Sequence, residues 1–167
     1  MLLDATGEIA DAWRLVPDDA DIPGDGPVIV PLSRLNEALA ARPATGIALP
    51  NDTDPANLAT HLPRLGLIAV DFPSFADGRG FSIARRLRDL GYAGRLRAVG
   101  AVIADQFAYL LACGFDEVRV ADDIALRQPV EQWMAQLGKI SQVYQRGGRA
   151  PSIPDQRRSS TSIATGV

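Results

Sequence analysis

The residues best suited to chemistry lie in a glycine-rich loop, Asp77-Gly78-Arg79-Gly80, between an apolar run and a helical pattern. Backbone N–H groups at a helix start lack partners, and the helix dipole favours an anion there. Arg79 adds a guanidinium that can hold sulfate, phosphate or a carboxylate through two hydrogen bonds. Gly78, Arg79, Gly80 and Ser82 are therefore predicted to bind an anion. The competing interpretation is structural: the glycines make the turn, and Asp77 or Ser82 caps the helix.

A second polar group, Arg97 and Gln106, follows the next apolar run. If the two runs form neighbouring parallel strands, Arg97 and Arg79 converge on one anion, and Gln106 orients it. The alternative is an ion pair of Arg97 with Asp71 or Asp77 that only holds the loops together.

Two carboxylates near this loop are the candidates for catalysis. Asp71 and Asp77 could serve as an acid/base pair, although loop carboxylates are usually solvated or cap helices. Asp71 ends a strand where a receiver domain has its phosphorylated aspartate, but the other receiver residues are missing. Cys113 is late in an apolar helix, which favours a buried structural thiol. His61 is expected at the surface.

No cofactor is predicted. The loop lacks the Lys-Ser/Thr pair of a Walker loop and the spacing of the dinucleotide fingerprint. Flavin remains open as a cofactor, because flavodoxin-like folds bind its phosphate through loops without one fixed motif. One cysteine and one histidine are too few for a disulfide, an all-cysteine cluster or a multi-histidine metal site within one chain, so no metal is expected.

Five short apolar runs are predicted to be strands, and they fall at 27–31, 46–50, 67–72, 96–99 and 117–120. Helical patterns alternate with them. Ser33 is placed to cap a helix over 34–41, Pro55 to open one through Leu62, and Asp105 to cap one that Gly114 ends. Further helices are expected from Phe81 to Leu90 and from about Ile124 or Pro129 to Tyr144. The spacing of apolar residues and the glycines that flank these segments predict them.

Alternating strands and helices predict an α/β fold with a five-stranded parallel sheet. The strands are nearly continuous in apolar character, which favours helices on both faces and hence a flavodoxin-like three-layer sandwich. A partial β/α barrel is the alternative. Residues 27–146 would form the α/β domain, residues 1–26 an N-terminal arm or hairpin, and residues 147–167, rich in Pro, Ser, Thr and Arg, a disordered tail.

Composition narrows the class of protein. The chain has 167 residues, a net charge of −3 and 47% apolar residues, which suits a folded domain and gives no reason to expect nucleic acid as a partner. The first residues carry no basic stretch or long apolar core, and no apolar run approaches the length of a membrane span. We expect a cytoplasmic protein without membrane contact.

The central block resembles a bacterial family, domain of unknown function 934. The residues that carry the resemblance are Phe72-Pro73-x-Phe75-x-Asp77-Gly78-Arg79-Gly80-Phe81-Ser82-x-Ala84-Arg85-x-Leu87-Arg88, Gly91-Tyr92-x-Gly94-x-Leu96-Arg97-Ala98-x-Gly100, Asp105-Gln106 and Cys113-Gly114-Phe115-Asp116. Members are often encoded beside assimilatory sulfite reductase and adenylyl-sulfate reductase, and are often labelled as oxidoreductases. The resemblance therefore implies a link to sulfite reduction, but no assigned mechanism.

Two functions follow from these observations. The first is an accessory protein of sulfite assimilation whose loop face binds an anion or a partner, such as sulfite reductase or another sulfur-assimilation enzyme. The second is a small enzyme, an oxidoreductase or one that acts on a phosphorylated or sulfated metabolite. In the second, Arg79 and Arg97 bind the anion and Asp71 or Asp77 transfers the proton. Whether the protein is an enzyme stays open at this point.

Overall fold

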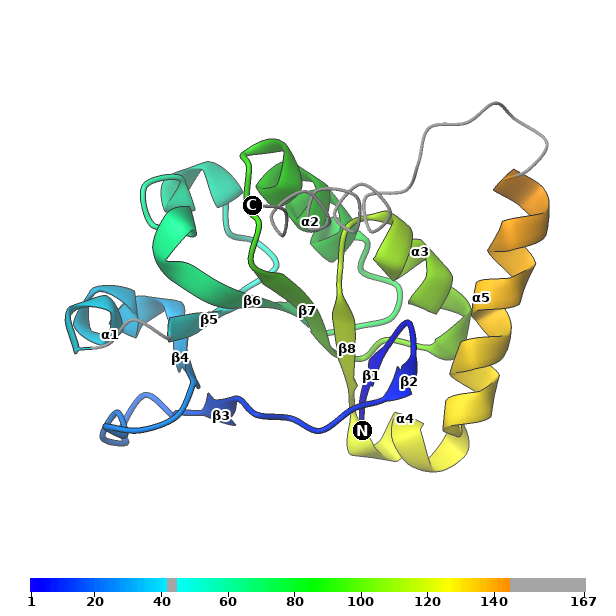
Figure 1. Cartoon of the computed structure of the whole chain (residues 1–167), viewed down its shortest axis with the longest axis horizontal. Helices are drawn as coiled ribbons and strands as arrows, with labels where there is room; N and C mark the ends of the chain where they lie inside the picture. Colours follow the sequence, from blue (N-terminus) through cyan, green and yellow to red (C-terminus); the bar gives the residue numbers. More distant parts are fainter. Residues whose placement is uncertain (42–44, 145–167) are drawn as a thin grey trace, which may run out of the picture.

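The computed structural model describes residues 1–41 and 45–144, which build one curled eight-stranded sheet with helices along its outer side (Figure 1). The strands are β1 (Leu2–Asp4), β2 (Gly7–Glu8), β3 (Arg14–Leu15), β4 (Val28–Pro31), β5 (Thr45–Leu49), β6 (Leu65–Phe72), β7 (Arg95–Gly100) and β8 (Glu117–Val120). The helices are α1 (Leu35–Ala41), α2 (Arg79–Asp89), α3 (Phe107–Ala112), α4 (Asp122–Arg127) and α5 (Val130–Tyr144). All five predicted strands are therefore confirmed, with shifts of one or two residues at their ends.

The strand order across the sheet is β2-β1-β8-β7-β6-β5-β4-β3. Strands β3 to β8 are parallel, and each of β4 to β8 pairs with the strand that precedes it in the chain. Strand β1 runs antiparallel to both β8 and β2. The α/β class is confirmed, but the flavodoxin-like five-stranded sheet is wrong. The partial-barrel alternative agrees with the curled sheet.

The strand order explains this correction. A doubly wound sheet reverses its direction of growth once, and that reversal carries later helices to the opposite face. Here the sheet grows in one direction from β3 to β8, so right-handed crossovers leave every connecting helix on the same face. That arrangement is the one found in β/α barrels, in which strands curl inside a layer of helices.

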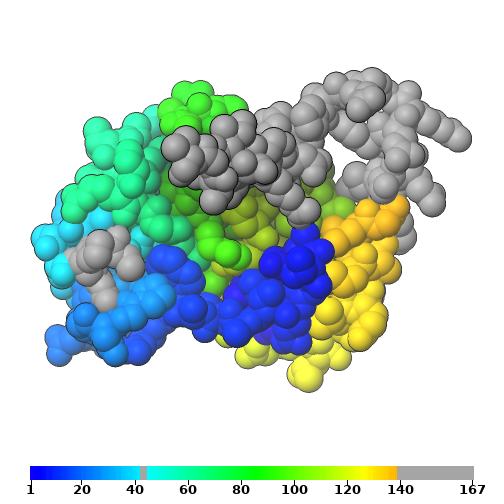
Figure 2. Space-filling view, viewed as in Figure 1, coloured from blue at the N-terminus to red at the C-terminus, as the bar shows by residue number. Residues whose placement is uncertain are grey.

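The side chains of each strand divide between two environments. The outward-facing residues form the main core with the helices, and they include Val28, Val30, Ile47, Ile68, Val70, Leu96, Ala98, Val118 and Val120. A smaller apolar cluster on the other face contains Ile29, Leu67 and Ala69, with Trp13, Ala48 and Val99 against it and no residue from a helix. The inner face of the curl is thus left to the N-terminal segment, the blue band in the space-filling view (Figure 2).

Several local predictions need correction. The segment after Pro55 forms two short 3₁₀ turns, Pro55–Leu58 and Leu62–Arg64, in place of one helix. The backbone hydrogen bonds of this segment join residues three apart, as from the His61 N–H to the Leu58 carbonyl at 2.8 Å. Ser33 lies within a 3₁₀ turn, Leu32–Arg34, that precedes α1, and its hydroxyl donates to Asp18 at 3.0 Å. Asp105 lies exposed within a 3₁₀ turn, Ala104–Gln106, where Gln106 accepts the Ile103 N–H instead.

The remaining helix predictions are confirmed in outline. Helix α2 ends as expected before Gly91, whose φ of +86° suits a residue without a side chain. The last predicted helix is interrupted at Gln128 and Pro129, so that α4 precedes α5.

The N-terminal residues belong to the sheet. Residues 1–26 contribute β1, β2 and β3, and β1 and β2 pair as an antiparallel hairpin. Leu3 is fully buried in the main core. The predicted tail, residues 147–167, lies outside the described residues.

Candidate functional site

The loop before α2 holds the predicted anion site, and its polar groups contact one another. The Arg79 guanidinium donates to the Asp77 carboxylate, with Nη2 at 2.6 Å and Nε at 3.0 Å, and the Arg79 backbone N–H donates to the same group at 3.1 Å. Asn51 donates to Asp77 from the loop after β5 at 2.8 Å. Side-chain and backbone hydrogen bonds from Arg79 hold the pKa of Asp77 well below its ordinary value. The Asp77 carboxylate therefore occupies the start of α2.

The two glycines of this loop have different surroundings. A Cβ at Gly80 would lie 2.7 Å from Cε2 of the buried Phe72 ring, so the helix can approach the strand only without a side chain here. Gly78 faces open space, and Ser82 is exposed. The structural roles of Asp77 and Gly80 are thus visible, while anion binding by Gly78, Arg79, Gly80 and Ser82 stays a prediction.

Gln106 holds the loop through two hydrogen bonds, and its predicted contact with an anion stays a prediction. Its Nε2 donates to the Phe75 carbonyl at 2.8 Å, and its Oε1 accepts the Ile103 N–H at 3.2 Å. The Phe75 side chain is 60% exposed on this loop. The result is an exposed aromatic side chain on a loop that Gln106 holds through the Phe75 carbonyl and Asn51 holds through the Asp77 carboxylate.

Arg97 lies elsewhere, on the inner face of the sheet, and is 3% exposed. Its two terminal nitrogens donate to the Asp11 carboxylate at 2.8 and 2.9 Å, and its Nε donates to Glu117 at 2.7 Å. The predicted partners, Asp71 and Asp77, are therefore wrong. The Arg97 and Arg79 guanidinium groups are engaged by different carboxylates, and their binding of one shared anion stays a prediction.

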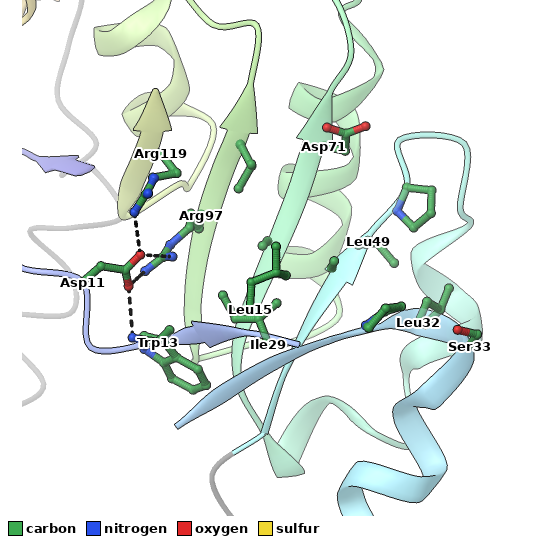
Figure 3. A pocket seen from close by; sticks show the side chains of 15 residues that line it. Asp11, Trp13, Leu15, Ile29, Leu32, Ser33, Leu49, Asp71, Arg97 and Arg119 are labelled. Carbon is green, nitrogen blue, oxygen red and sulfur yellow. Dashed lines mark hydrogen bonds and ion pairs between the residues drawn. The ribbon is translucent and has the colours of Figure 1, made fainter. Parts of the chain in front are cut away.

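Asp11 lies in the segment between β2 and β3 and accepts hydrogen bonds from arginines of two strands, β7 and β8. Besides Arg97, it accepts from Arg119 of β8 at 3.0 Å (Figure 3). Burial raises the pKa of Asp11, but the hydrogen bonds from Arg97 and the Trp13 N–H and the charges of Arg97 and Arg119 outweigh it. The pKa of Asp11 consequently lies below its ordinary value, and the side chain is ionised at neutral pH.

These residues border a groove of about 760 Å³ on the inner face of the sheet. Its lining is mostly apolar, with one charged group formed by Asp11, Arg97 and Arg119 and a second formed by Asp71. The full lining comprises Asp11, Trp13, Leu15, Ile29, Pro31, Leu32, Ser33, Ala48, Leu49, Pro50, Ala69, Asp71, Arg97, Val99 and Arg119. Figure 3 places Asp71 at the upper end of its strand, away from the group formed by Asp11, Arg97 and Arg119. A site of this size and polarity suits a small organic molecule.

Trp13 closes one side of the groove, and two glycines make room for it. A Cβ at Gly46 would lie 3.0 Å from the indole, and one at Gly66 would lie 2.9 Å from it. The N-terminal segment is therefore seated by shape against β5 and β6 and by charge against β7 and β8.

The proposed acid/base pair has unequal members. Asp77 is engaged by Arg79 and Asn51, and its lowered pKa makes it a poor proton acceptor at neutral pH. Asp71 is exposed and lines the groove. Catalysis by either residue stays a prediction. Within residues 1–41 and 45–144, no three His, Cys, Asp or Glu side chains are grouped as metal ligands.

Sequence reasoning missed Asp11, Trp13, Glu117 and Arg119. A signal for the last two was present, because Arg95-Leu96-Arg97-Ala98 and Glu117-Val118-Arg119-Val120 alternate charged and apolar residues. Strict alternation is typical of a strand with one covered face, so it indicated the open side of the sheet. Asp11 carried no comparable signal.

A family model described as "Bacterial protein of unknown function (DUF934)" matches residues 46–153, more than half of the chain. The match begins within β5, so it covers Asp71, the glycine-rich loop, Arg97 and Gln106 but not Asp11 or Trp13. A comparison with curated proteins found no match. In the described part of the chain, no helix has the length and apolar character needed to cross a membrane.

Proposed function

The chain belongs to the DUF934 family, and we propose that it is an accessory protein of assimilatory sulfite reduction that acts by binding one of the pathway's enzymes. The link to sulfite reduction comes from the resemblance described above. The binding surface is assigned to the loop side of the sheet, around Phe75 and Arg79.

The exposed Phe75 on a fastened loop is the observation that carries this proposal. Hydrogen bonds from Asn51 and Gln106 and the Asp77–Arg79 pair hold the loop that carries this ring. A surface that is already ordered loses little conformational entropy when a partner binds. Exposed aromatic residues and arginines are also the types enriched among residues that dominate binding energy.

Neighbouring residues extend this surface. Tyr109 lies about one turn along α3 from Gln106 and is 46% exposed. Its ring packs against Phe81 with 4.9 Å between centroids, and the Arg85 guanidinium lies 5.6 Å from the Tyr109 centroid. The loop side thus presents two partly exposed aromatic rings and two arginines, Arg79 and Arg85, to a partner.

The test is direct binding to purified sulfite reductase and adenylyl-sulfate reductase from a bacterium that encodes them beside a member of this family. Wild-type protein should bind one of them, and Phe75→Ala should weaken binding by about thirtyfold, the scale of a dominant interface residue. Leu126→Ala is the matched control, because Leu126 is 88% exposed on α4. Failure of wild type to bind either enzyme, or equal losses in the two variants, would contradict the proposal.

The enzyme alternative makes a different prediction. It requires Arg79 to bind the anionic group of a metabolite and Asp71 or Asp77 to transfer a proton. Arg79 already pairs with Asp77 at 2.6 Å, so a metabolite must displace that carboxylate. Turnover of sulfite, a nicotinamide or a sulfated metabolite by the purified protein alone would favour the enzyme over the accessory protein.

A further inference from the structure

The groove on the inner face has a positively charged end that an internal carboxylate fills. Asp11 receives hydrogen bonds from both terminal nitrogens of Arg97 and from Arg119 (Figure 3). Its side chain is 19% exposed, against 4% for Arg97. Bidentate contact with one guanidinium plus a second arginine is the arrangement in which proteins bind carboxylate groups.

The arginine fork is fixed in place independently of Asp11. Glu117, which is 2% exposed, accepts from the Arg97 Nε and also pairs with Arg95. The two terminal nitrogens of Arg97 therefore point at the same position whether or not Asp11 is there. Without Asp11, the cations of Arg95, Arg97 and Arg119 would face one carboxylate, and an anion at that position would replace the negative charge of Asp11.

The floor of the groove beside Arg97 is formed by residues with short side chains. Arg97 is in register with Ala69, which is in register with Ala48, and Ala48 with Pro31. In a sheet, residues in register point to the same face, so this row runs across the inner face of the curl. Short side chains along the row leave the hollow of about 760 Å³, with Val99 and Ile29 on neighbouring rows.

The segment that carries Asp11 is held at two separate points. The Ile9 N–H donates to the Leu2 carbonyl at 2.9 Å, and the Arg14 N–H donates to the Pro27 carbonyl at 3.1 Å. Between them, the described contacts with the sheet include the Asp11 ion pairs and the packing of Trp13 against Ile29, Leu67 and Ala69, with Gly46 and Gly66 leaving room for the indole. Release of Asp11 therefore leaves both ends of the segment anchored.

We propose that the groove binds a small apolar carboxylic acid, whose carboxylate replaces Asp11 on Arg97 and Arg119 and whose apolar body lies over Ala69, Ala48 and Val99. Asp11 then acts as an internal competitor that occupies the site until such a ligand arrives. Asp71, at the far end of the groove, disfavours the reversed orientation by charge repulsion. This groove lies on the inner face of the sheet, so its occupation does not depend on a partner at the Phe75 loop.

The test compares three probes. Phenylacetate carries both the carboxylate and the apolar body, acetate carries the carboxylate alone, and phenylethanol carries the apolar body alone. Calorimetric titration and tryptophan fluorescence should show phenylacetate binding about tenfold more tightly to Asp11→Ala than to wild type, because a tethered competitor has a high effective concentration. Acetate and phenylethanol should each bind more weakly than phenylacetate. The same affinity for phenylacetate in wild type and variant would overturn the proposal, as would equal binding of phenylethanol.

A second pair of variants separates the site from a general loosening of the chain. Asp11→Asn keeps the shape of the side chain and removes its charge, so it should also bind phenylacetate more tightly than wild type. Adding Arg119→Met to Asp11→Ala should weaken phenylacetate binding relative to Asp11→Ala, because only the Arg97 fork then remains for the carboxylate. Equal phenylacetate affinity in the single and the double variant would assign the ligand to another surface and overturn the proposal.

Discussion

At the scale of single residues, Arg97 and Arg79 differ in the carboxylates with which they pair. Arg97 is shared by Asp11 and Glu117 in a buried cluster, whereas Arg79 pairs with Asp77 at the surface with a side chain that is 58% exposed. Removing one member of a buried pair typically costs about 3–5 kcal/mol, while exposed pairs contribute about 1 kcal/mol or less. The two arginines that looked equivalent in the sequence therefore have different roles: one holds the N-terminal segment and the other holds a loop.

The pH dependence of stability should reveal the Asp77–Arg79 pair. The pKa of Asp77 lies below its ordinary value of 3.8, so the unfolded chain takes up a proton before the folded protein does. The contribution of Asp77 is complete above the ordinary pKa and is lost as the pH falls from there through the lower folded value. In thermal melts, the difference in melting temperature between wild type and Asp77→Asn should narrow from pH 6 to pH 3.

Arg79→Gln removes the cation of the same pair and should show the same narrowing against wild type. A difference that stays constant from pH 6 to pH 3 in both variants would mean that the pair does not contribute to folding. It would also leave Arg79 available to an external anion.

At the scale of elements, helix α2 is placed by the contact between Gly80 and the ring of Phe72. Phe72 is 1% exposed and packs edge-on against Phe81 and Phe115, with centroids 5.3 and 5.8 Å away. The ring therefore has no space into which it could move. The glycine-rich loop that suggested ligand binding in the sequence is, at this position, a condition for packing a helix on its strand.

Substitution of the two loop glycines should have opposite effects. Gly80→Ala should lower the free energy of unfolding by about 1–3 kcal/mol, because its methyl group would overlap the Phe72 ring. Gly78→Ala is the matched control, since nothing lies within 4 Å of its Cβ position and its φ is −83°. It should be neutral or stabilising by about 0.4–1 kcal/mol through the unfolded state. Urea denaturation measures both, and equal effects would contradict this account of Gly80.

At the scale of the whole molecule, the N-terminal residues complete the sheet. Strand β1 covers the edge of β8, and β3 extends the other end of the sheet beside β4. An uncovered edge strand is a site for unwanted pairing with other chains, and the N-terminal hairpin removes that edge from β8. The domain that the sequence placed at 27–146 therefore shares its core with residues before it.

Leu3 and Leu15 give a matched test of this arrangement. Leu3→Ala should lower the free energy of unfolding by about 2–5 kcal/mol, because the side chain is fully buried in the main core. Leu15→Ala, in the same N-terminal segment, should change it by less than about 0.5 kcal/mol, since Leu15 is 65% exposed. Chemical denaturation of both variants measures the difference. A small effect at Leu3 would mean that the hairpin is an appendage after all.

The sequence by itself determined the elements. Apolar runs bounded by glycine and proline located the five central strands, and the spacing of apolar residues located α2, because these patterns depend on near neighbours in the chain. The alternation of charged and apolar residues in β7 and β8 also indicated that no helix covers one face of these strands. Tertiary structure decided the rest. Whether a crossover continues or reverses the growth of a sheet is set by packing among distant segments, and the ion pair of Asp11 with Arg97 joins residues 86 positions apart. No local periodicity records such a contact, so the groove and the residue that fills its charged end emerge only when the N-terminal segment crosses the folded sheet.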